Sequence, residues 1–272
     1  MVDLSQYLQT RELPLIMGIV NVTNDSFSNQ GKFNTLDDAL QMLEDGADIL
    51  DIGGESTRPD AEEISPELEL ARVLPLVKEL KKVAPKAILS VDTRKFEVAE
   101  RVLDEGVEII NDVSNLTYAP KIAKIVASYG AGLVLMHSRG NPQNMMQMCN
   151  YTNLVSEVRL NLEQSMNFAV ASGVKKSNIW IDPGLGFAKK GEQNFELLNG
   201  IKELKTLAPV LIGHSRKRFI RDFLNVEVDK SDFGTAAVSI YAMQQGAQIL
   251  RVHDVKNNYD VLKMYKRCNC HE

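Results

Sequence analysis

The fold is decided by the stretch AILSVDTRKFEVAERVLDEGVEII, residues 87–110. Two short apolar runs, Ala87–Val91 and Val107–Ile110, open and close it without clean polar alternation, which is typical of parallel strands covered on both faces. Between them apolar residues recur with helical period; Thr93 can cap the start of a helix and Gly106 can end it. The stretch therefore predicts one strand–helix–strand unit.

This unit recurs along the whole chain of 272 residues, which has room for eight units of about 34 residues. No proline- or glycine-rich linker divides the chain. We therefore predict an α/β fold, a single (β/α)8 TIM-barrel domain over residues 1–272, with a doubly wound open sheet as the alternative. The predicted strands are Leu15–Val20, Ile49–Ile52, Ala87–Val91, Val107–Ile110, Leu133–Met136, Ile179–Ile181, Val210–Ile212 and Ile249–Val252.

Further residues mark where helices should begin and end. Ser65 precedes Pro66, which is typical of a cap followed by the first helical residue, and Thr35 with Asp38 resembles a capping box. Glycines can adopt the left-handed conformation that ends many helices. The predicted helix-ending glycines are Gly46, Gly106, Gly130 and Gly173.

The composition excludes several classes of protein. Lys and Arg number 31 against 36 Asp and Glu, a formal charge of −5 without a basic stripe, so we expect no nucleic-acid partner. The apolar run Leu13–Val20 is broken by Pro14, so we expect no signal peptide and no membrane span. Three cysteines form no disulfide framework, which favours the cytoplasm. The tail Cys268–His271 falls short of a four-ligand zinc site, and we interpret it as a frayed terminus.

Polar residues gather at the carboxyl ends of the predicted strands, where barrels place their active sites. Side chains alternate along a strand, so Asp92 shares a face with Ile88 and Ser90, Asn111 with Ile109, and Asp182 with Trp180. They can therefore converge on the barrel mouth, where two carboxylates and an amide suit a flat heterocycle rich in N–H donors. Asp92 and Asp182 can alternatively cap the helices that follow them.

A cationic cluster follows the last two strands, where barrels commonly hold phosphate. Lys217 comes after the seventh strand, and Arg251 and His253 alternate at the end of the eighth. Because the net charge is negative, an anionic substrate needs such local cations. Two long polar loops, Asn21–Gly31 and Glu55–Ala61, have the length and polarity of functional lids. We interpret His137 and His214 as structural.

Eight motifs are spread over the chain from Leu15 to Val255. They are MGIVNVTNDSFS (17–28), DIGGESTRP (51–59), SVDT (90–93), INDV (110–113), LMH (135–137), DPGLGF (182–187), SRK (215–217) and RVHDV (251–255). In this order they resemble the motifs of dihydropteroate synthases. The resemblance implies a (β/α)8 barrel, usually a homodimer, and a transferase of folate biosynthesis. Such an enzyme joins 4-aminobenzoate to 6-hydroxymethyl-7,8-dihydropterin diphosphate with Mg²⁺ and is open to inhibition by sulfonamides.

The resemblance also implies roles for single residues. The pterin would be held by Asp92, Asn111, Asp182 and Lys217, with Met136 packed nearby. The diphosphate would be bound by Arg251, His253 and Asn21, and Asn21 would also contact Mg²⁺. The aminobenzoate side would be formed by Thr57, Arg58, Pro59, Phe27, Phe187 and Ser215. Asp25 would lie near the reacting carbon, and the predicted catalytic residues are Asp25, Lys217, Arg251 and His253.

The implied chemistry follows from the residue types. A departing diphosphate gains negative charge, which Arg251, protonated His253 and Mg²⁺ would stabilise more in the transition state than in the ground state. An electron-rich pterin can support a cation at its methylene, so we expect a dissociative substitution. The amine of aminobenzoate is neutral at pH 7, so no strong base is required.

The chain departs from the family in two places. Asn29-Gln30-Gly31 replaces the usual Asp-Gly-Gly, and Arg218 follows Lys217 where a small residue is common. Two alternatives therefore stay open. One is a catalytically silent pterin-binding paralogue. The other is a pterin-dependent methyltransferase, which would need neither the Arg251–His253 cluster nor the long first loop.

Overall fold

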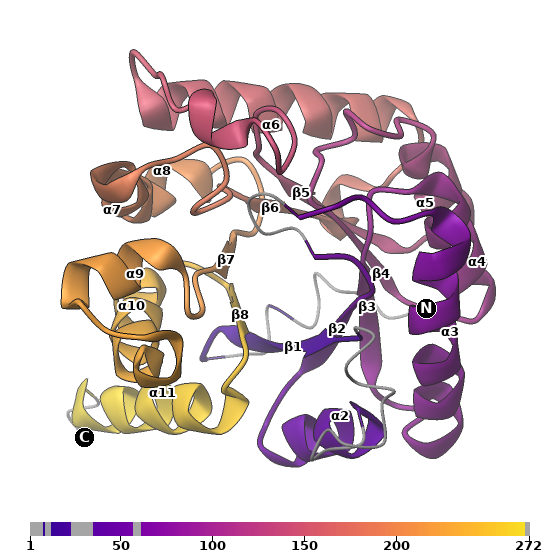
Figure 1. Cartoon of the computed structure of the whole chain (residues 1–272), viewed down its shortest axis with the longest axis horizontal. Coiled ribbons are helices and arrows are strands. Elements are labelled where there is room, and N and C mark those ends of the chain that lie inside the picture. The colour runs from indigo at the N-terminus through magenta and orange to yellow at the C-terminus, as the bar shows by residue number, and fades with distance from the viewer. Residues whose placement is uncertain (1–7, 9–11, 23–34, 57–60, 270–272) are drawn as a thin grey trace.

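The computed structural model describes residues 8, 12–22, 35–56 and 61–269. Eight parallel strands in these ranges form one sheet in the order β6-β5-β4-β3-β2-β1-β8-β7. A parallel bridge between Ile181 and Val210 links the two outer strands, so the sheet curls into a barrel (Figure 1). The strands are β1 (Leu15–Asn21), β2 (Ile49–Gly53), β3 (Ile88–Asp92), β4 (Ile109–Asp112), β5 (Gly132–Met136), β6 (Ile179–Asp182), β7 (Leu211–Gly213) and β8 (Ile249–Val252).

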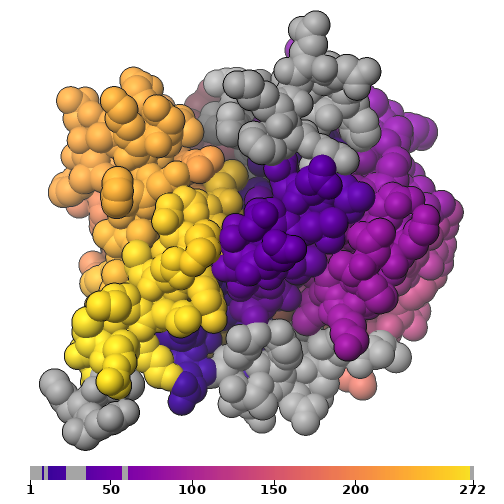
Figure 2. All heavy atoms as spheres, turned by 90° about the horizontal axis from the view of Figure 1, so that it is seen from below, coloured from indigo at the N-terminus to yellow at the C-terminus, as the bar shows by residue number. Residues whose placement is uncertain are grey.

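Helices surround this barrel on the outside (Figure 1). The last of them lies beside the first strand–helix unit, as expected where β8 pairs with β1 to close the ring (Figure 2). The predicted (β/α)8 fold is therefore confirmed, and the alternative prediction of a doubly wound open sheet is wrong. The helices are α2 (Thr35–Glu44), α3 (Pro66–Val83), α4 (Phe96–Asp104), α5 (Ile122–Tyr129), α6 (Leu154–Ala171), α7 (Gly191–Asn199), α8 (Ile201–Leu204), α9 (Arg218–Leu224), α10 (Asp232–Gln245) and α11 (Val255–Asn269).

Two apolar layers hold the barrel together. The larger lies between strands and helices, and the smaller fills the inside of the barrel. Trp180 is the largest side chain of the inner layer and is 1% exposed. Because side chains alternate along a strand, the next inward position is the one that reaches the barrel mouth. The inner layer consists of Leu15, Met17, Ile49, Ile88, Ile109, Val134, Trp180, Leu211 and Ile249.

The helix boundaries agree with the sequence prediction except at one cap. Ser65 caps α3, where its side chain accepts a hydrogen bond from the Leu68 N–H at 3.3 Å. Thr93 does not cap α4 as predicted, because that helix begins at Phe96 with Lys95 at the cap position. Thr93 Oγ1 instead accepts from the Lys95 N–H, at 3.2 Å.

Four glycines end helices as predicted, each with a positive φ angle. Thr35 is the first residue of α2 and Asp38 the fourth, and the position before the helix lies outside the described ranges, so the capping box stays a prediction. None of the helices in the described ranges is both long and apolar enough to cross a membrane.

Candidate active site

Arg251 lies at the centre of the barrel mouth and joins three strands. It leaves β8 directly above Ile249 of the inner layer. Its Nε donates to Asp51 Oδ2 of β2 at 2.6 Å, and a terminal nitrogen donates to Asp92 Oδ2 of β3 at 2.9 Å. Asn111 Nδ2 of β4 donates to the same Asp51 oxygen at 3.0 Å. These contacts confirm that Asp92, Asn111 and Arg251 converge.

Asp51 is a site residue that the sequence analysis did not single out. It is fully buried, and its second oxygen, Oδ1, has no hydrogen-bond partner among the described residues. A buried carboxylate is costly unless it is paired, so Asp51 depends on Arg251 and Asn111. The signal was present in the sequence, since Asp51 follows Ile49 by two positions and so faces the same way.

Asp182 lies on the other side of the mouth, at the end of β6. Its Oδ1 accepts from the Gly184 N–H at 2.7 Å. Gly213 on the neighbouring strand borders both this carboxylate and Arg251, since a Cβ atom there would lie 3.4 Å from Asp182 Oδ2 and 3.9 Å from Arg251 Cδ. Met136 is paired with Asp182 across β5 and β6 and is buried.

Lys217 completes this side of the mouth. Its Nζ donates to the backbone oxygen of Leu185 and lies 4.7 Å from the centre of the Phe187 ring. Both partners belong to the turn that follows Asp182. The structure thus brings Asp182, Phe187 and Lys217 together, as the sequence motifs indicate.

Burial changes the protonation of these groups. It raises the pKa of Asp92 to about 7, with Arg251 opposing the rise and Asp51 adding to it. Burial likewise raises the pKa of Asp182, which Lys217 opposes. It lowers the pKa of Lys217 to about 8, against the attraction of Asp182. The mouth therefore holds charges that a polar ligand can stabilise by hydrogen bonds.

Ser215 and His253 are joined at the edge of the mouth. Ser215 Oγ accepts from the His253 N–H at 3.1 Å and lies 2.9 Å from His253 Nδ1. The turn between Ser215 and Lys217 is held by Arg216, which has a φ of 55° and binds both carboxylate oxygens of Asp232 at 2.7 and 2.9 Å. Arg216 therefore fixes a turn that carries two predicted site residues.

The two histidines at the ends of β5 and β7 have structural surroundings. Burial, together with Lys189, lowers the pKa of His137 to about 2, and Lys189 Nζ lies 2.8 Å from His137 Nδ1. Burial lowers the pKa of His214 to about 4, and its Nε2 lies 2.7 Å from Ser239 Oγ. Both rings are neutral at pH 7, in agreement with a structural interpretation.

The other residues that the sequence singles out lie in different places. Asn21 ends β1 on the same strand face as Leu15 and Met17 of the inner layer, at the carboxyl end of the barrel, and is exposed. Arg218 points to solvent, and its Nε donates to Asp222 one turn along α9 at 3.1 Å. The remaining predicted site residues, together with the altered segment of the first loop, lie outside the described ranges. They are Asp25, Phe27, Thr57, Arg58 and Pro59.

The barrel and its buried polar mouth define a class of small-molecule-binding barrel proteins, and the comparison with known families agrees. Residues 17–253 match the family described as pterin binding enzyme. This range contains β1 to β8 almost entirely, together with every described residue of the mouth.

Individual relatives narrow this class. A dihydropteroate synthase of a Synechocystis species is 42% identical over 255 residues, which cover 92% of this chain and 88% of the relative. The Xanthomonas albilineans dihydropteroate synthase solved with 4-aminobenzoic acid has a TM-score of 0.88 and 38% identity, covering 96% and 95% of the two chains. The Yersinia pestis dihydropteroate synthase solved with a sulfonamide drug complex has a TM-score of 0.88 and 38% identity, covering 94% of each chain. The chain therefore belongs to the dihydropteroate synthase family of pterin-binding enzymes.

Proposed function

We propose that this chain joins 4-aminobenzoate to 6-hydroxymethyl-7,8-dihydropterin diphosphate and releases diphosphate, forming 7,8-dihydropteroate. The observation that carries the proposal is the arrangement of buried acceptors and cations around one barrel mouth. Asp182, Asn111 and Lys217 supply the polar edge that a pterin requires, while Arg251 supplies positive charge beside it. Family membership makes the reaction class follow from this arrangement.

The pterin would be recognised by complementary hydrogen bonds. Asn111 uses its Nδ2 to donate to Asp51, which leaves its side-chain oxygen to accept from a ring N–H. Asp182 Oδ2 is the second acceptor, and Lys217 donates to the carbonyl side of the ring. A ligand without these donors would form no hydrogen bond to the buried Asp182 Oδ2, so the mouth discriminates against it.

The departure of diphosphate would be assisted by Arg251. Negative charge grows on the leaving oxygen as the carbon–oxygen bond breaks, and a positioned cation stabilises that charge most in the transition state. Asp51 and Asp92 hold the guanidinium in place before substrate arrives, so little reorganisation is needed. The reaction would be dissociative, and the neutral amine of aminobenzoate would then attack the pterin methylene without a strong base.

The donor set fits Mg²⁺ that arrives with the substrate. Within the described residues, no group of three or more His, Cys, Asp or Glu side chains is placed to hold a metal ion. Mg²⁺ is commonly bound by few protein oxygens together with substrate phosphates and water, and the exposed Asn21 amide is a suitable oxygen donor. When bound, the ion would neutralise charge on the diphosphate. Asn21 is the residue we assign to it.

We also propose a homodimer. An apolar patch, defined here as Phe223, Leu224, Val228 and Phe233, is exposed at the junction of α9 and α10; Phe233 is 91% and Phe223 72% exposed. Patches of this kind mark interaction surfaces. In Figure 2 the orange region that contains the patch stands at the edge of the molecule. We assign this patch to contact with a second copy of the chain, because most soluble oligomers are symmetric assemblies of identical chains.

Two smaller proposals complete the function. Sulfonamides should inhibit the enzyme at the aminobenzoate side, as the drug complex of the Yersinia pestis relative suggests. A cytoplasmic location is supported by Cys149 and Cys268, which are both free thiols.

One experiment separates the proposed function from its two alternatives. Purified protein is given the pterin diphosphate and Mg²⁺, with and without 4-aminobenzoate, and diphosphate release is measured. We expect release only with aminobenzoate. A silent paralogue would change the fluorescence of Trp180, the single tryptophan, on binding pterin but would release nothing. A methyltransferase would instead transfer a methyl group from methyltetrahydrofolate.

A further inference from the structure

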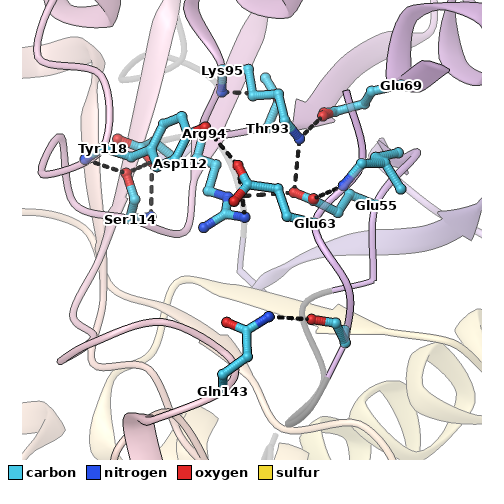
Figure 3. Close-up of polar contacts among 12 residues, drawn as sticks. Glu55, Glu63, Glu69, Thr93, Arg94, Lys95, Asp112, Ser114, Tyr118 and Gln143 are labelled. Atoms are coloured by element: carbon cyan, nitrogen blue, oxygen red, sulfur yellow. Dashed lines mark hydrogen bonds and ion pairs between the residues drawn. The ribbon is translucent and has the colours of Figure 1, made fainter. Parts of the chain in front are cut away.

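Both described ends of the second loop meet on one carboxylate. Glu55 leaves the end of β2, and its Oε1 accepts from the N–H of Ile64, the residue before the α3 cap, at 3.0 Å (Figure 3). Its Oε2 accepts from Lys95 Nζ at 3.0 Å. The segment that leaves β2 and the segment that leads into α3 are therefore both bound to the Glu55 carboxylate. Residues 57–60 run between them.

Lys95 anchors this point to the body of the barrel. It stands at the start of α4 and is only 1% exposed, although lysine is almost never fully buried. Its Nζ lies 2.5 Å from Glu69 Oε2 of α3 as well as 3.0 Å from Glu55. A buried charge with two fixed partners tolerates little displacement, because any loosened partner remains uncompensated.

These ion pairs also set the protonation of Glu55. Burial by itself would raise the pKa of Glu55, but the Ile64 N–H and the charges of Lys95 and Arg94 outweigh it, so the pKa is lowered. Glu55 is therefore ionised at neutral pH and stays bound to Lys95.

A second set of contacts holds the returning end of the loop from the outside. Arg94 lies 3.4 Å from both Glu55 and Glu63, and the Tyr118 hydroxyl donates to Glu63 at 2.6 Å (Figure 3). Gln143 Nε2 donates to the Ala61 carbonyl at 2.7 Å. Elements following β3, β4 and β5 thus all contact the same few residues.

This network forms one wall of a pocket that reaches the active site. Glu55, Ser56, Arg94 and Phe187 are all among the residues that line this pocket. Phe187 lies against Lys217 in the barrel mouth. A displacement of Glu55 would therefore alter the lining of this pocket, which includes neither Asp182 nor Asn111.

We infer that Lys95 is a positioning residue for the acceptor side of the reaction. By holding Glu55 beside Glu69, Lys95 fixes Glu55 and the Ile64 end of the second loop, and with them part of the lining of the pocket that we assign to aminobenzoate. This inference rests on the proposed function. Asn111, Asp182 and Lys217, which supply the polar edge for the pterin, have their own partners in Asp51, Gly184 and Leu185.

The test compares Lys95→Met with a matched control, Lys81→Met. Lys81 is paired with Glu108 at 2.5 Å but at the opposite end of the barrel, before β4. In Lys95→Met we expect the KM for aminobenzoate to rise at least tenfold, while the dissociation constant of the pterin diphosphate, followed by Trp180 fluorescence, stays within twofold. Hydrogen exchange at the Ile64 amide should become faster. The control should change none of these.

Other results of this experiment would contradict either the role of Lys95 or the proposed function. An unchanged KM for aminobenzoate, or an equal loss for both substrates, contradicts the positioning role even if exchange at Ile64 quickens. If Lys95→Met does not fold, Glu69→Gln keeps the Lys95–Glu55 pair and should show the same selective change at smaller amplitude. Wild-type protein without turnover would overturn the proposed function, and exchange at Ile64 would still report whether Lys95 fixes the loop.

Discussion

At the scale of single residues, Arg251 is the side chain on which the site depends most. It is paired with two buried carboxylates, Asp51 and Asp92, and it is the cation that we assign to the departing diphosphate. Removing one partner of a buried ion pair leaves the other uncompensated, so the cost falls on both structure and chemistry. Catalysis and stability at this position are therefore coupled.

Arg251→Ala should lower turnover by more than tenfold, a loss of more than about 1.4 kcal/mol in transition-state stabilisation. The reason is the lost charge opposite the leaving group. Steady-state kinetics with saturating pterin diphosphate measure it, and Arg101→Ala on the exposed side of α4 serves as the control. Turnover within tenfold of wild type would show that Arg251 does not carry the assigned role.

His214 gives a prediction for stability against pH. Its pKa is about 4 in the fold and about 6.5 when unfolded, so the neutral form is favoured by folding. As the pH falls below 6.5, His214 is protonated in the unfolded chain but not yet in the folded one. The contribution of neutral His214 to the free energy of unfolding is therefore complete above pH 6.5 and decreases as the pH falls toward 4. The gap in unfolding free energy between wild type and His214→Gln should narrow by about 2 kcal/mol between pH 7 and pH 5. Urea unfolding measures this, and a constant gap would contradict it.

At the scale of elements, the eight strands were predictable because buried parallel strands are apolar along their whole length. Every predicted strand was confirmed, with ends that differ by at most two residues. The Thr93 cap was wrong because the buried Lys95 ion pairs, which join residues far apart in sequence, decide where α4 begins. The Lys95 network escaped prediction because its partners lie on other elements, whereas Asp51 was missed although its spacing from Ile49 indicated the direction in which it faces.

A substitution at Gly184 tests whether the turn after Asp182 is closely packed. A Cβ atom at this position would lie 2.0 Å from the His137 carbonyl oxygen, and φ is +69°. Gly106 has a similar φ of +85° but only Lys81 Cε within 4 Å, at 3.9 Å, so Gly106→Ala should cost roughly 1 to 2 kcal/mol of unfolding free energy. Gly184→Ala should cost clearly more and weaken pterin binding. Equal losses in thermal unfolding would contradict the close packing of this turn.

At the scale of the whole molecule, the barrel gathers a small number of charges at one end of an otherwise mildly acidic protein. The formal charge of −5 attracts no anion by itself, and the described cations of the mouth, Lys217 and Arg251, are both held among carboxylates. Their placement depends on the closure of the sheet, because β8 must meet β1 for Arg251 to reach β2 and β3.

If the chain forms a homodimer through the apolar patch, a mutation in that patch should lower the mass of the sedimenting particle. Wild-type protein should sediment with twice the chain mass of 30.3 kDa, and Phe233→Glu should shift it toward the monomer because a charge would be buried in the interface. Leu160→Glu on α6, a residue 55% exposed, is the matched control and should leave the mass unchanged. A monomeric wild type would contradict the proposal.

The most direct test of the central claim is a crystal structure of the chain with 7,8-dihydropteroate bound. The account predicts the pterin ring between Asp182, Asn111 and Lys217, above Trp180, with the aminobenzoyl group on the Phe187 side of the second loop. Product bound outside the carboxyl ends of the strands, or bound in the mouth without contact to Asp182 and Asn111, would contradict it.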